Sequence, residues 1–380
     1  MKKTIRILIA LMVPIFLAPS LSIAKPITGN AGGQIDPQII NRFKAPWALA
    51  FITDQTLLVT TKSGQMFVVT TDGQSTAVEG LPEVFEGGQG GMGDVTPHPD
   101  FAENQFIYFS FVASHDQGKT RFARVMRAKL TVEPTPRLTN LERIWDQTPA
   151  TSGRGHFSHR IVFAPKDSDQ AGMMFITSGD RQELDPAQDW DSSLGKIIRL
   201  HDDGRIPQDN PFQDKGEVAK TFWTLGHRNA LGISFDAKGQ LWAHEMGPRH
   251  GDELNLIIKG QNYGWPLVSE GHHYSGWPIP SHDTRPEFAA PKAFWVPTIA
   301  PSGLMIYSGD EFPQWQGDAF IGGLRSQALI RVDLNNNQAV EAERFEWSKR
   351  VRDVAMAPNG HIYVLEDGNN GRLIRFTNPE

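Results

Sequence analysis

Short apolar runs alternate with polar turns along this sequence, and one such unit recurs. In each copy, an apolar run of about four to six residues is followed by a turn rich in Pro, Asp or Gly and then by a second apolar run. The copies are WALAFITDQTLLVTT from Trp47, GDVTPHPDFAENQFIYFSF from Gly93, RIVFAPKDSDQAGMMFITSGD from Arg160, LGISFDAKGQLWAHE from Leu231, SGLMIYSGDEFPQWQGDAFIGG from Ser302 and RDVAMAPNGHIYVLEDG from Arg352. Several copies continue with a third run: GQMFVVTT, GKIIRLHDDG, QALIRVDL and GRLIRFT.

Repeats of this kind predict an all-β fold, because the runs have the length of strands and no long amphipathic helix is visible. About sixty residues per repeat suit one four-stranded blade with a functional loop, so the sequence predicts a six-bladed β-propeller. A large β-sandwich is the alternative, but it would not give six similar units.

Glycine-, histidine- and aspartate-rich insertions follow several predicted strands, at residues 86–91, 151–159, 180–191 and 244–253. Loops on one face of a propeller converge on its central channel, so chemistry is expected in these insertions. The His-, Pro-, Ser- and Gly-rich segment 270–291 is interpreted as a surface loop, because the repeats continue after it. We therefore expect residues 25–380 to form one propeller domain.

The N-terminus has the pattern of a secretory signal peptide. Three of its first six residues are basic, an apolar run extends from Ile7 to Ala18, and Ser22-Ile23-Ala24 forms a small-residue cleavage site. We predict that residues 1–24 are a signal peptide and that the mature protein is periplasmic or secreted. An uncleaved membrane anchor is the alternative, but the apolar run is short for a bilayer span. No later segment is predicted to cross a membrane.

Charge and cysteine content narrow the possible partners. The formal net charge is −6, and it becomes −9 when the predicted signal is removed, because three basic and no acidic residues are lost. A chain of this sign is not expected to bind nucleic acid. The sequence has no cysteine, which excludes disulfides, thiol catalysis, iron–sulfur clusters and Cys-ligated zinc. Stability must then come from packing or from bound ions.

Two loop side chains are candidates for acid–base chemistry. His156 lies in a glycine-flanked loop before the first strand of the third repeat, where an imidazole can act as a general base. The sequence alone does not separate it from His159. Asp180, at the end of that repeat's second strand, could orient a histidine and stabilise its imidazolium form. Taken by itself, Asp180 is more simply interpreted as a turn cap.

Arginines recur where predicted inner strands begin. Arg228 and Asn229 open the fourth repeat, and Arg350 and Arg352 open the sixth, where strand alternation places both on one face. Guanidinium groups suit a bidentate grip on carboxylates, and two on one face need an anionic partner. A surface ion pair would satisfy this need, but an innermost strand favours the channel. With Arg325, four arginines would line one cavity, whose ligand would carry several carboxylates.

The stretch LWAHEMGPRHGDELNL, residues 241–256, is a candidate metal site. It opens like the helical zinc motif H-E-x-x-H. Gly247 and Pro248 would break such a helix, and Pro248 takes the place of the second histidine. An oxygen-rich turn with Gly-Pro carbonyls suits Ca²⁺, which accepts main-chain oxygen ligands. The other polar side chains would then have structural roles: His244, Glu245 and Asp252.

These motifs resemble those of the soluble pyrroloquinoline quinone (PQQ)-dependent glucose/sorbosone dehydrogenases, and especially the periplasmic aldose sugar dehydrogenases. The resemblance extends from about Ala45 to Phe376. It rests on PWALAF, GQGGMGDV, GHFSHRIVF, GRIPQDNPF, LGHRNALG, HEMGPRHGDELN, GQNYGWP, PTIAPSG, FIGGL and RVRDV. Members of this family are six-bladed propellers that hold PQQ over the channel, which agrees with the independent repeat count.

The resemblance implies a role for each candidate. His156 matches the general base that removes the sugar hydroxyl proton while hydride leaves C1 for C5 of the quinone, Asp180 matches the acid beside it, and Gln89 matches a residue near the sugar. The carbonyls of Gly247 and Pro248 match those that hold the PQQ-bound Ca²⁺. The implied PQQ contacts are Arg228, Asn229, Arg350, Arg352 and Arg325, the last at a position that is commonly lysine.

Three departures from the family pattern accompany the match. Ser158-His159 replaces a usual Gly-Gly, Ala230-Leu231 replaces a usual Pro-Gln, and Arg325 replaces lysine, which is not equivalent toward a cofactor. The leading hypothesis is a PQQ- and Ca²⁺-dependent dehydrogenase that oxidises the C1 hydroxyl of an aldose to the lactone and passes electrons to an external acceptor. The departures leave a second hypothesis, a cofactor-less propeller that binds carbohydrate or protein. A third, a calcium-dependent lactone hydrolase, would not need the arginines.

Overall fold

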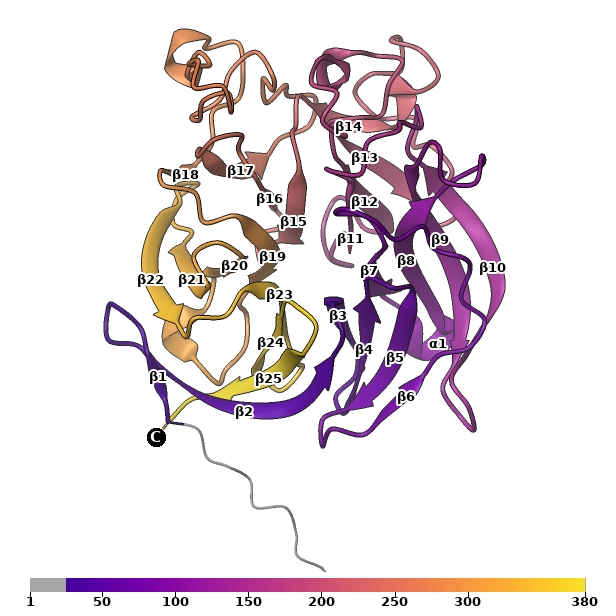
Figure 1. The fold of residues 1–380 in the computed structure, drawn as a ribbon, viewed down its shortest axis with the longest axis vertical. Coiled ribbons are helices and arrows are strands. Elements are labelled where there is room, and N and C mark those ends of the chain that lie inside the picture. Colours follow the sequence, from indigo (N-terminus) through magenta and orange to yellow (C-terminus); the bar gives the residue numbers. More distant parts are fainter. Residues whose placement is uncertain (1–24, 380) are drawn as a thin grey trace, which may run out of the picture.

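The computed structural model of this chain describes residues 25–379, which form six antiparallel sheets arranged in a ring (Figure 1). Blade 1 contains β3 (Pro46–Thr53), β4 (Thr56–Thr61), β5 (Gln65–Thr70) and β6 (Ser75–Ala77). Blade 2 contains β7 (Met92–Pro97), β8 (Phe106–Ala113), β9 (Phe122–Thr131) and β10 (Arg137–Asp146). Blade 3 contains β11 (Ser158–Phe163), β12 (Met173–Ser178), β13 (Lys196–His201) and β14 (Phe222–Leu225).

The second half of the chain builds the remaining blades. Blade 4 contains β15 (Ala230–Phe235), β16 (Leu241–Glu245), β17 (Asp252–Ile257) and β18 (Ala293–Trp295). Blade 5 contains β19 (Pro301–Ile306), β20 (Ala319–Gly323), β21 (Ala328–Asp333) and β22 (Val340–Glu346). Blade 6 contains β23 (Val351–Met356), β24 (Ile362–Glu366), β25 (Gly371–Thr377) and β2 (Gln34–Phe43), with β1 (Ile27–Thr28) at its edge.

The ring closes by pairing the two ends of the described chain. Strand β2 lies antiparallel to β25, with Ile39 opposite Ile374, so the first long strand completes the last blade (Figure 1). Closure of this kind leaves only short edges to be protected. The six-bladed β-propeller prediction is therefore confirmed. The predicted signal peptide, residues 1–24, lies outside the described residues.

The six sequence repeats are the first and second strands of the six blades, and the four predicted third strands are β5, β13, β21 and β25. The outermost strands were not predicted. Strand β6, for example, is exposed along its whole length and has a partner on one side only. A strand of this kind buries no face, so it carries no hydrophobic pattern.

Helices are few and short in residues 25–379. They are the α-helix α1 (Phe101–Asn104) and the 3-10 helices η1 (Asp185–Gln188), η2 (Ala219–Thr221), η3 (His282–Thr284) and η4 (Pro313–Trp315). Within this range, no helix has both the length and the apolar character that crossing a membrane requires. The predicted surface loop 270–291 lies between β17 and β18 and contains η3.

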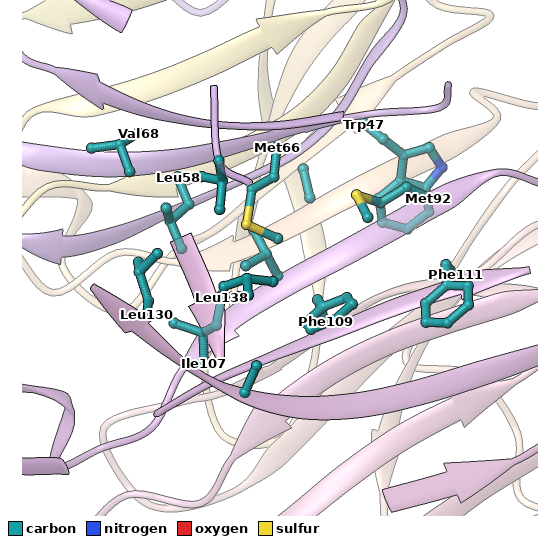
Figure 2. Close-up of a cluster of buried hydrophobic side chains, with 14 of the residues drawn as sticks. Trp47, Leu58, Met66, Val68, Met92, Ile107, Phe109, Phe111, Leu130 and Leu138 are labelled. Carbon is teal, nitrogen blue, oxygen red and sulfur yellow. The ribbon is translucent and has the colours of Figure 1, made fainter. Parts of the chain in front are cut away.

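The hydrophobic core lies between neighbouring blades. Between blades 1 and 2, Leu58 and Met66 from one sheet pack against Ile107 and Phe109 from the next, and all four are fully buried (Figure 2). Burial of each such side chain contributes about 1.5–3 kcal/mol. Because every interface repeats this arrangement, the six sheets form one rigid frame around the channel.

A buried ionic cluster crosses the channel and was not foreseen from the sequence. Arg160 on β11 forms ion pairs of 3.0 Å with Asp94 on β7 and 3.0 Å with Asp353 on β23. Its Nε donates to the carbonyl oxygen of Leu231 on β15, and its guanidinium carbon lies 4.1 Å from the ring centroid of Trp47 on β3. One side chain thus ties together five of the six inner strands.

Candidate functional site

Two adjoining cavities are lined by loops and by the ends of inner strands. The arginine cavity, of about 400 Å³, is lined by Arg350, Arg352 and Asn229 among others. The histidine cavity, of about 490 Å³, is lined among others by His156 and by four further predicted residues: Arg228, Gly247, Pro248 and Arg325. Gln89 lines both cavities. The fold therefore brings nine of the ten predicted residues to one place, and the tenth, Asp180, lies directly behind His156.

His156 is oriented by a buried carboxylate. Its Nδ1 lies 2.7 Å from Oδ1 of Asp180, and Oδ2 of Asp180 accepts a hydrogen bond of 2.8 Å from Nε1 of Trp265. An ionised carboxylate can only accept, so the proton of the neutral imidazole sits on Nδ1. The lone pair of Nε2 then faces the histidine cavity and is available to take a proton.

The loop that carries His156 is held in an unusual backbone conformation. His156 has a φ of 48°, in the left-handed region. Its main-chain N–H donates to Oε1 of Gln89 at 2.8 Å. Fully buried Arg181 clamps the same loop, since its Nε donates to the Gly155 carbonyl at 2.9 Å and its guanidinium stacks on Phe157 at 3.6 Å. Burial lowers the pKa of Arg181 to about 10. Arg181 was missed because its role depends on carbonyls distant in sequence.

Arg350 and Arg352 converge on one carboxylate. Nε of Arg350 lies 2.7 Å and Nη2 of Arg352 lies 3.2 Å from the oxygens of Asp367. With Lys62, which sequence reasoning also missed, the arginine cavity has three cationic side chains and one anionic one, a formal charge of +2. Nδ2 of Asn229, which is 1% exposed, has no hydrogen-bond partner within residues 25–379. The cavity thus presents charge and donors to an anionic ligand.

The four predicted arginines are divided between these two adjoining cavities. Arg350 and Arg352 line the arginine cavity, whereas Arg228 and Arg325 line the adjoining histidine cavity. Arg228 does not line the arginine cavity, because its Nη1 donates to the main-chain oxygens of Met246 at 2.9 Å and Gly247 at 2.7 Å.

The Gly247-Pro248 turn is braced from below. One carboxylate oxygen of Asp252 accepts from the Gly247 N–H at 3.0 Å, and the other accepts from the main chain at Ile299 and Ala300, each at 2.8 Å. A Cβ on Gly247 would lie 2.2 Å from the His250 carbonyl oxygen, so only glycine fits. Main-chain oxygens at such a turn are ligands of the type that Ca²⁺ accepts.

The polar side chains around this turn have structural roles, as predicted. Glu245 accepts from Nδ1 of His227 at 3.0 Å and from the main-chain N–H of Arg228 at 2.5 Å. His244 is fully buried on β16 and lines neither cavity. Residues 25–379 contain no group of three or more His, Cys, Asp and Glu side chains placed to hold a metal ion.

Comparison with known proteins identifies relatives over nearly the whole chain. The sequence profile described as Glucose / Sorbosone dehydrogenase matches residues 43–375. The aldose sugar dehydrogenase YliI of Escherichia coli is 36% identical over 375 residues, which cover 96% of this chain and 97% of that protein. Quinoprotein glucose dehydrogenase B of Acinetobacter calcoaceticus is 25% identical over 89% of this chain and 90% of its own length.

Solved structures agree with the sequence comparison. The apo form of the soluble aldose sugar dehydrogenase from Escherichia coli has a TM-score of 0.84 at 34% identity, covering 91% of this chain and 100% of that chain. The PQQ-bound form of an aldose sugar dehydrogenase from Streptomyces coelicolor has a TM-score of 0.76 at 26% identity, covering 92% and 99%. The motifs, the propeller and the profile match all point the same way, and the chain therefore belongs to the glucose/sorbosone dehydrogenase family.

Proposed function

We propose that this protein is a PQQ- and Ca²⁺-dependent dehydrogenase that oxidises the C1 hydroxyl of an aldose sugar to the lactone. The observation that carries the proposal is the carboxylate-oriented His156, whose free Nε2 lone pair lies beside a cavity with a formal charge of +2. Family membership supports the same reaction, since relatives are named as aldose sugar and quinoprotein glucose dehydrogenases.

The residues present fit the implied cofactor. PQQ carries three carboxylates, and the arginine cavity offers Arg350, Arg352, Lys62 and the unpartnered Nδ2 of Asn229. The carbonyls of Gly247 and Pro248 would hold the calcium ion, the former through its second lone pair, since Arg228 already donates to the Gly247 oxygen at 2.7 Å. When bound, PQQ supplies the hydride acceptor and Ca²⁺ acts as a Lewis acid that makes the quinone a better one.

Side chains of this protein would accept the proton of the sugar hydroxyl and stabilise the resulting charge. Nε2 of His156 accepts the proton of the C1 hydroxyl as that O–H bond breaks and hydride leaves the carbon. The resulting imidazolium is stabilised by the carboxylate of Asp180, which Trp265 holds in place. Arg228 and Gln89 border the same cavity and would position the sugar and the cofactor.

The predicted secretory signal supports a periplasmic or secreted location, with an external electron acceptor that reoxidises the cofactor. A separate acceptor is needed because reduced PQQ must pass on its two electrons before another sugar molecule can be oxidised. We propose no membrane span after signal cleavage and no nucleic-acid partner.

Titration of the metal-stripped protein with PQQ and Ca²⁺ tests the proposal. Reduction of an artificial electron acceptor by a panel of aldoses is expected only when both are added. Arg352→Met is expected to raise the Kd for PQQ, measured by fluorescence, by about tenfold to a hundredfold, because a charge-assisted contact is lost. Arg205→Met, at a surface ion pair, serves as the control. Sugar or lactone turnover that needs no PQQ would contradict the proposal, as would binding of sugar without any quinone effect.

The pH profile tests the role of His156. Burial lowers the pKa of His156 below its ordinary value, Asp180 opposes this effect, and the charge of Arg228 adds to it. A lowered pKa keeps the imidazole neutral, and able to accept a proton, at lower pH. The midpoint of the acid limb of kcat/KM is therefore expected to lie below pH 6.5, the ordinary histidine value. Values of kcat/KM measured between about pH 4 and 8 test this expectation. A midpoint at or above pH 6.5 would show that the base is not His156 in this environment.

A further inference from the structure

His159 lines the arginine cavity, yet the proposed reaction gives it no role. Its side chain is held firmly. The imidazole stacks on Trp47 with ring centroids 5.2 Å apart and an angle of 12° between the planes. It also fills the space above Gly93, where an added Cβ would lie only 1.8 Å from Cε1 of His159. The residue is 2% exposed, so its polar atoms must be satisfied by the protein, by water in the cavity or by a ligand.

Contacts around one hydroxyl determine which ring nitrogen carries the proton. Oγ of Ser110 lies 2.7 Å from Nδ1 and 2.8 Å from the carbonyl oxygen of His159, and it accepts from the N–H of Asp94 at 2.8 Å. A hydroxyl has one hydrogen, and a carbonyl oxygen can only accept. Ser110 therefore donates to the carbonyl and accepts from Nδ1–H, which leaves a lone pair on Nε2.

The lone pair on Nε2 has no donor within residues 25–379, because Ser110 is the only hydrogen-bond partner of the ring there and it contacts Nδ1. Burial, with the charges of Arg160 and Arg181, lowers the pKa of His159 to about 3, so the ring is neutral at physiological pH. Nε2 is not among the fully buried polar atoms that lack a partner, so it is an acceptor open to the arginine cavity. A ligand in the cavity would supply the missing donor.

The backbone conformation around His159 also favours a role in ligand binding. Ser158 and His159 have φ values of 57° and 56°, in the left-handed region that favours glycine. Such strain is typical of functional positions. Oγ of Ser158 donates to Oδ1 of Asn229 at 3.1 Å, which leaves Nδ2 of Asn229 unpartnered on the same cavity. The cavity thus contains one free acceptor and one free donor, from residues close to each other in the structure.

We propose that His159 is a cofactor-binding residue, in which Nε2 accepts a hydrogen bond from an N–H group of the bound ligand. The inference rests on the proposed function and deepens it. PQQ with ionised carboxylates has one N–H group, that of its pyrrole ring. Most of the other polar groups of the cavity are cations or donors, and the carboxylate of Asp367 already accepts from Arg350 and Arg352.

Nitrogen NMR of the ¹⁵N-histidine-labelled full-length mature protein tests this directly. In the ligand-free protein, Nε2 of His159 is expected to show the resonance of an unprotonated ring nitrogen, and PQQ with Ca²⁺ is expected to shift it toward a hydrogen-bonded value. His244 is the internal control, because it is buried, has its pKa lowered to about 3 by burial, and lines neither cavity. A protonated Nε2 in the free protein, or a resonance that PQQ leaves unmoved, would overturn the inference.

Variants separate binding from folding. His159→Leu keeps bulk but removes the acceptor, and it is expected to raise the Kd for PQQ about tenfold. His159→Gln places an acceptor oxygen near the position of Nε2 and is expected to recover most of the affinity. His361→Leu, immediately before β24 and outside both cavities, is expected to bind normally.

The possible failures are distinguishable. If the wild-type protein binds PQQ and His159→Leu, still folded by circular dichroism, binds it equally well, the inference is wrong and the proposed function stands. If the wild-type protein does not bind PQQ, the proposed function fails and the inference fails with it. If His159→Leu changes only the KM for the sugar, the residue contacts substrate rather than cofactor, which also overturns the inference.

Discussion

Replacing His156 by alanine is expected to lower kcat for sugar oxidation by about two to four orders of magnitude, the usual contribution of a general base. The expectation follows from geometry, since Asp180 holds Nδ1 at 2.7 Å and leaves Nε2 facing the cavity. Two other histidines lie nearby, but His159 lines the adjoining cavity and is held by Ser110, whereas Nδ1 of His250 accepts from the main-chain N–H of Thr298 at 3.2 Å. Steady-state rates with PQQ, Ca²⁺ and an artificial acceptor measure the effect.

The design of this experiment separates chemistry from binding. His156→Ala should leave the Kd for PQQ within about twofold, whereas His361→Ala should leave both binding and rate unchanged. Asp180→Asn is expected to lower kcat as well, because the imidazolium loses its counter-charge. Since Asp180 acts through His156, the double variant should be no slower than His156→Ala alone. A rate within tenfold of the wild type for His156→Ala would remove His156 from the mechanism.

Replacing Arg160 by methionine is expected to produce the largest loss of stability, about 3–5 kcal/mol in the free energy of unfolding. Arg160 is the shared partner of Asp94 and Asp353, at 3.0 Å from each, and all three side chains are buried. Its removal would leave two carboxylates without a cation at the centre of the channel. Urea unfolding followed by tryptophan fluorescence measures the change.

Two comparisons identify the cause of that loss. Arg205→Met, at an exposed pair with Asp203, should change stability by less than about 0.5 kcal/mol. The triple variant Asp94→Asn, Arg160→Met, Asp353→Asn should regain part of the loss, because it buries no unpaired charge. If the triple variant is as unstable as Arg160→Met, lost packing against Trp47 is responsible instead.

The sign of the pH dependence gives a further check on Arg160→Met. Burial raises the pKa of Asp94 to about 6 even beside Arg160, and it also raises that of Asp353. A raised carboxyl pKa contributes stability that is present at low pH and lost as pH rises through the folded value. In Arg160→Met, protonation would neutralise both carboxylates, so the deficit should shrink from pH 8 to pH 5.

Much of the fold was predictable from the sequence, because local hydrophobic patterns and turn residues specify the inner strands. Each inner hairpin buries apolar residues on a short period and turns at Pro, Asp or Gly, so the six repeats located twelve strands and the blade count. The outer strand β6 escaped prediction because it is exposed along its whole length and needs no apolar pattern. The pairing of β2 with β25 is a contact between chain ends, which no local pattern encodes.

The candidate site was also predictable only in part from the sequence. Residue type and spacing were enough to select His156, the Gly247-Pro248 turn and the strand-opening arginines, because their chemistry is intrinsic to the side chains and to the resemblance they carry. The sequence also indicated that His244 and Glu245 are structural. It could not place Arg228 and Arg325 in a different cavity from Arg350, because side-chain direction depends on which carbonyls the fold brings near.

Only the tertiary structure decided which of the two neighbouring histidines is oriented as a base. His156 and His159 are three residues apart, and the sequence does not separate them. The fold places Asp180 against the first and Ser110 against the second, and these partners are 24 and 49 residues away along the chain. The sequence supplies the chemical groups and the strands that hold them. Long-range packing sets the protonation, burial and direction of each group, because these depend on neighbours that local sequence does not specify.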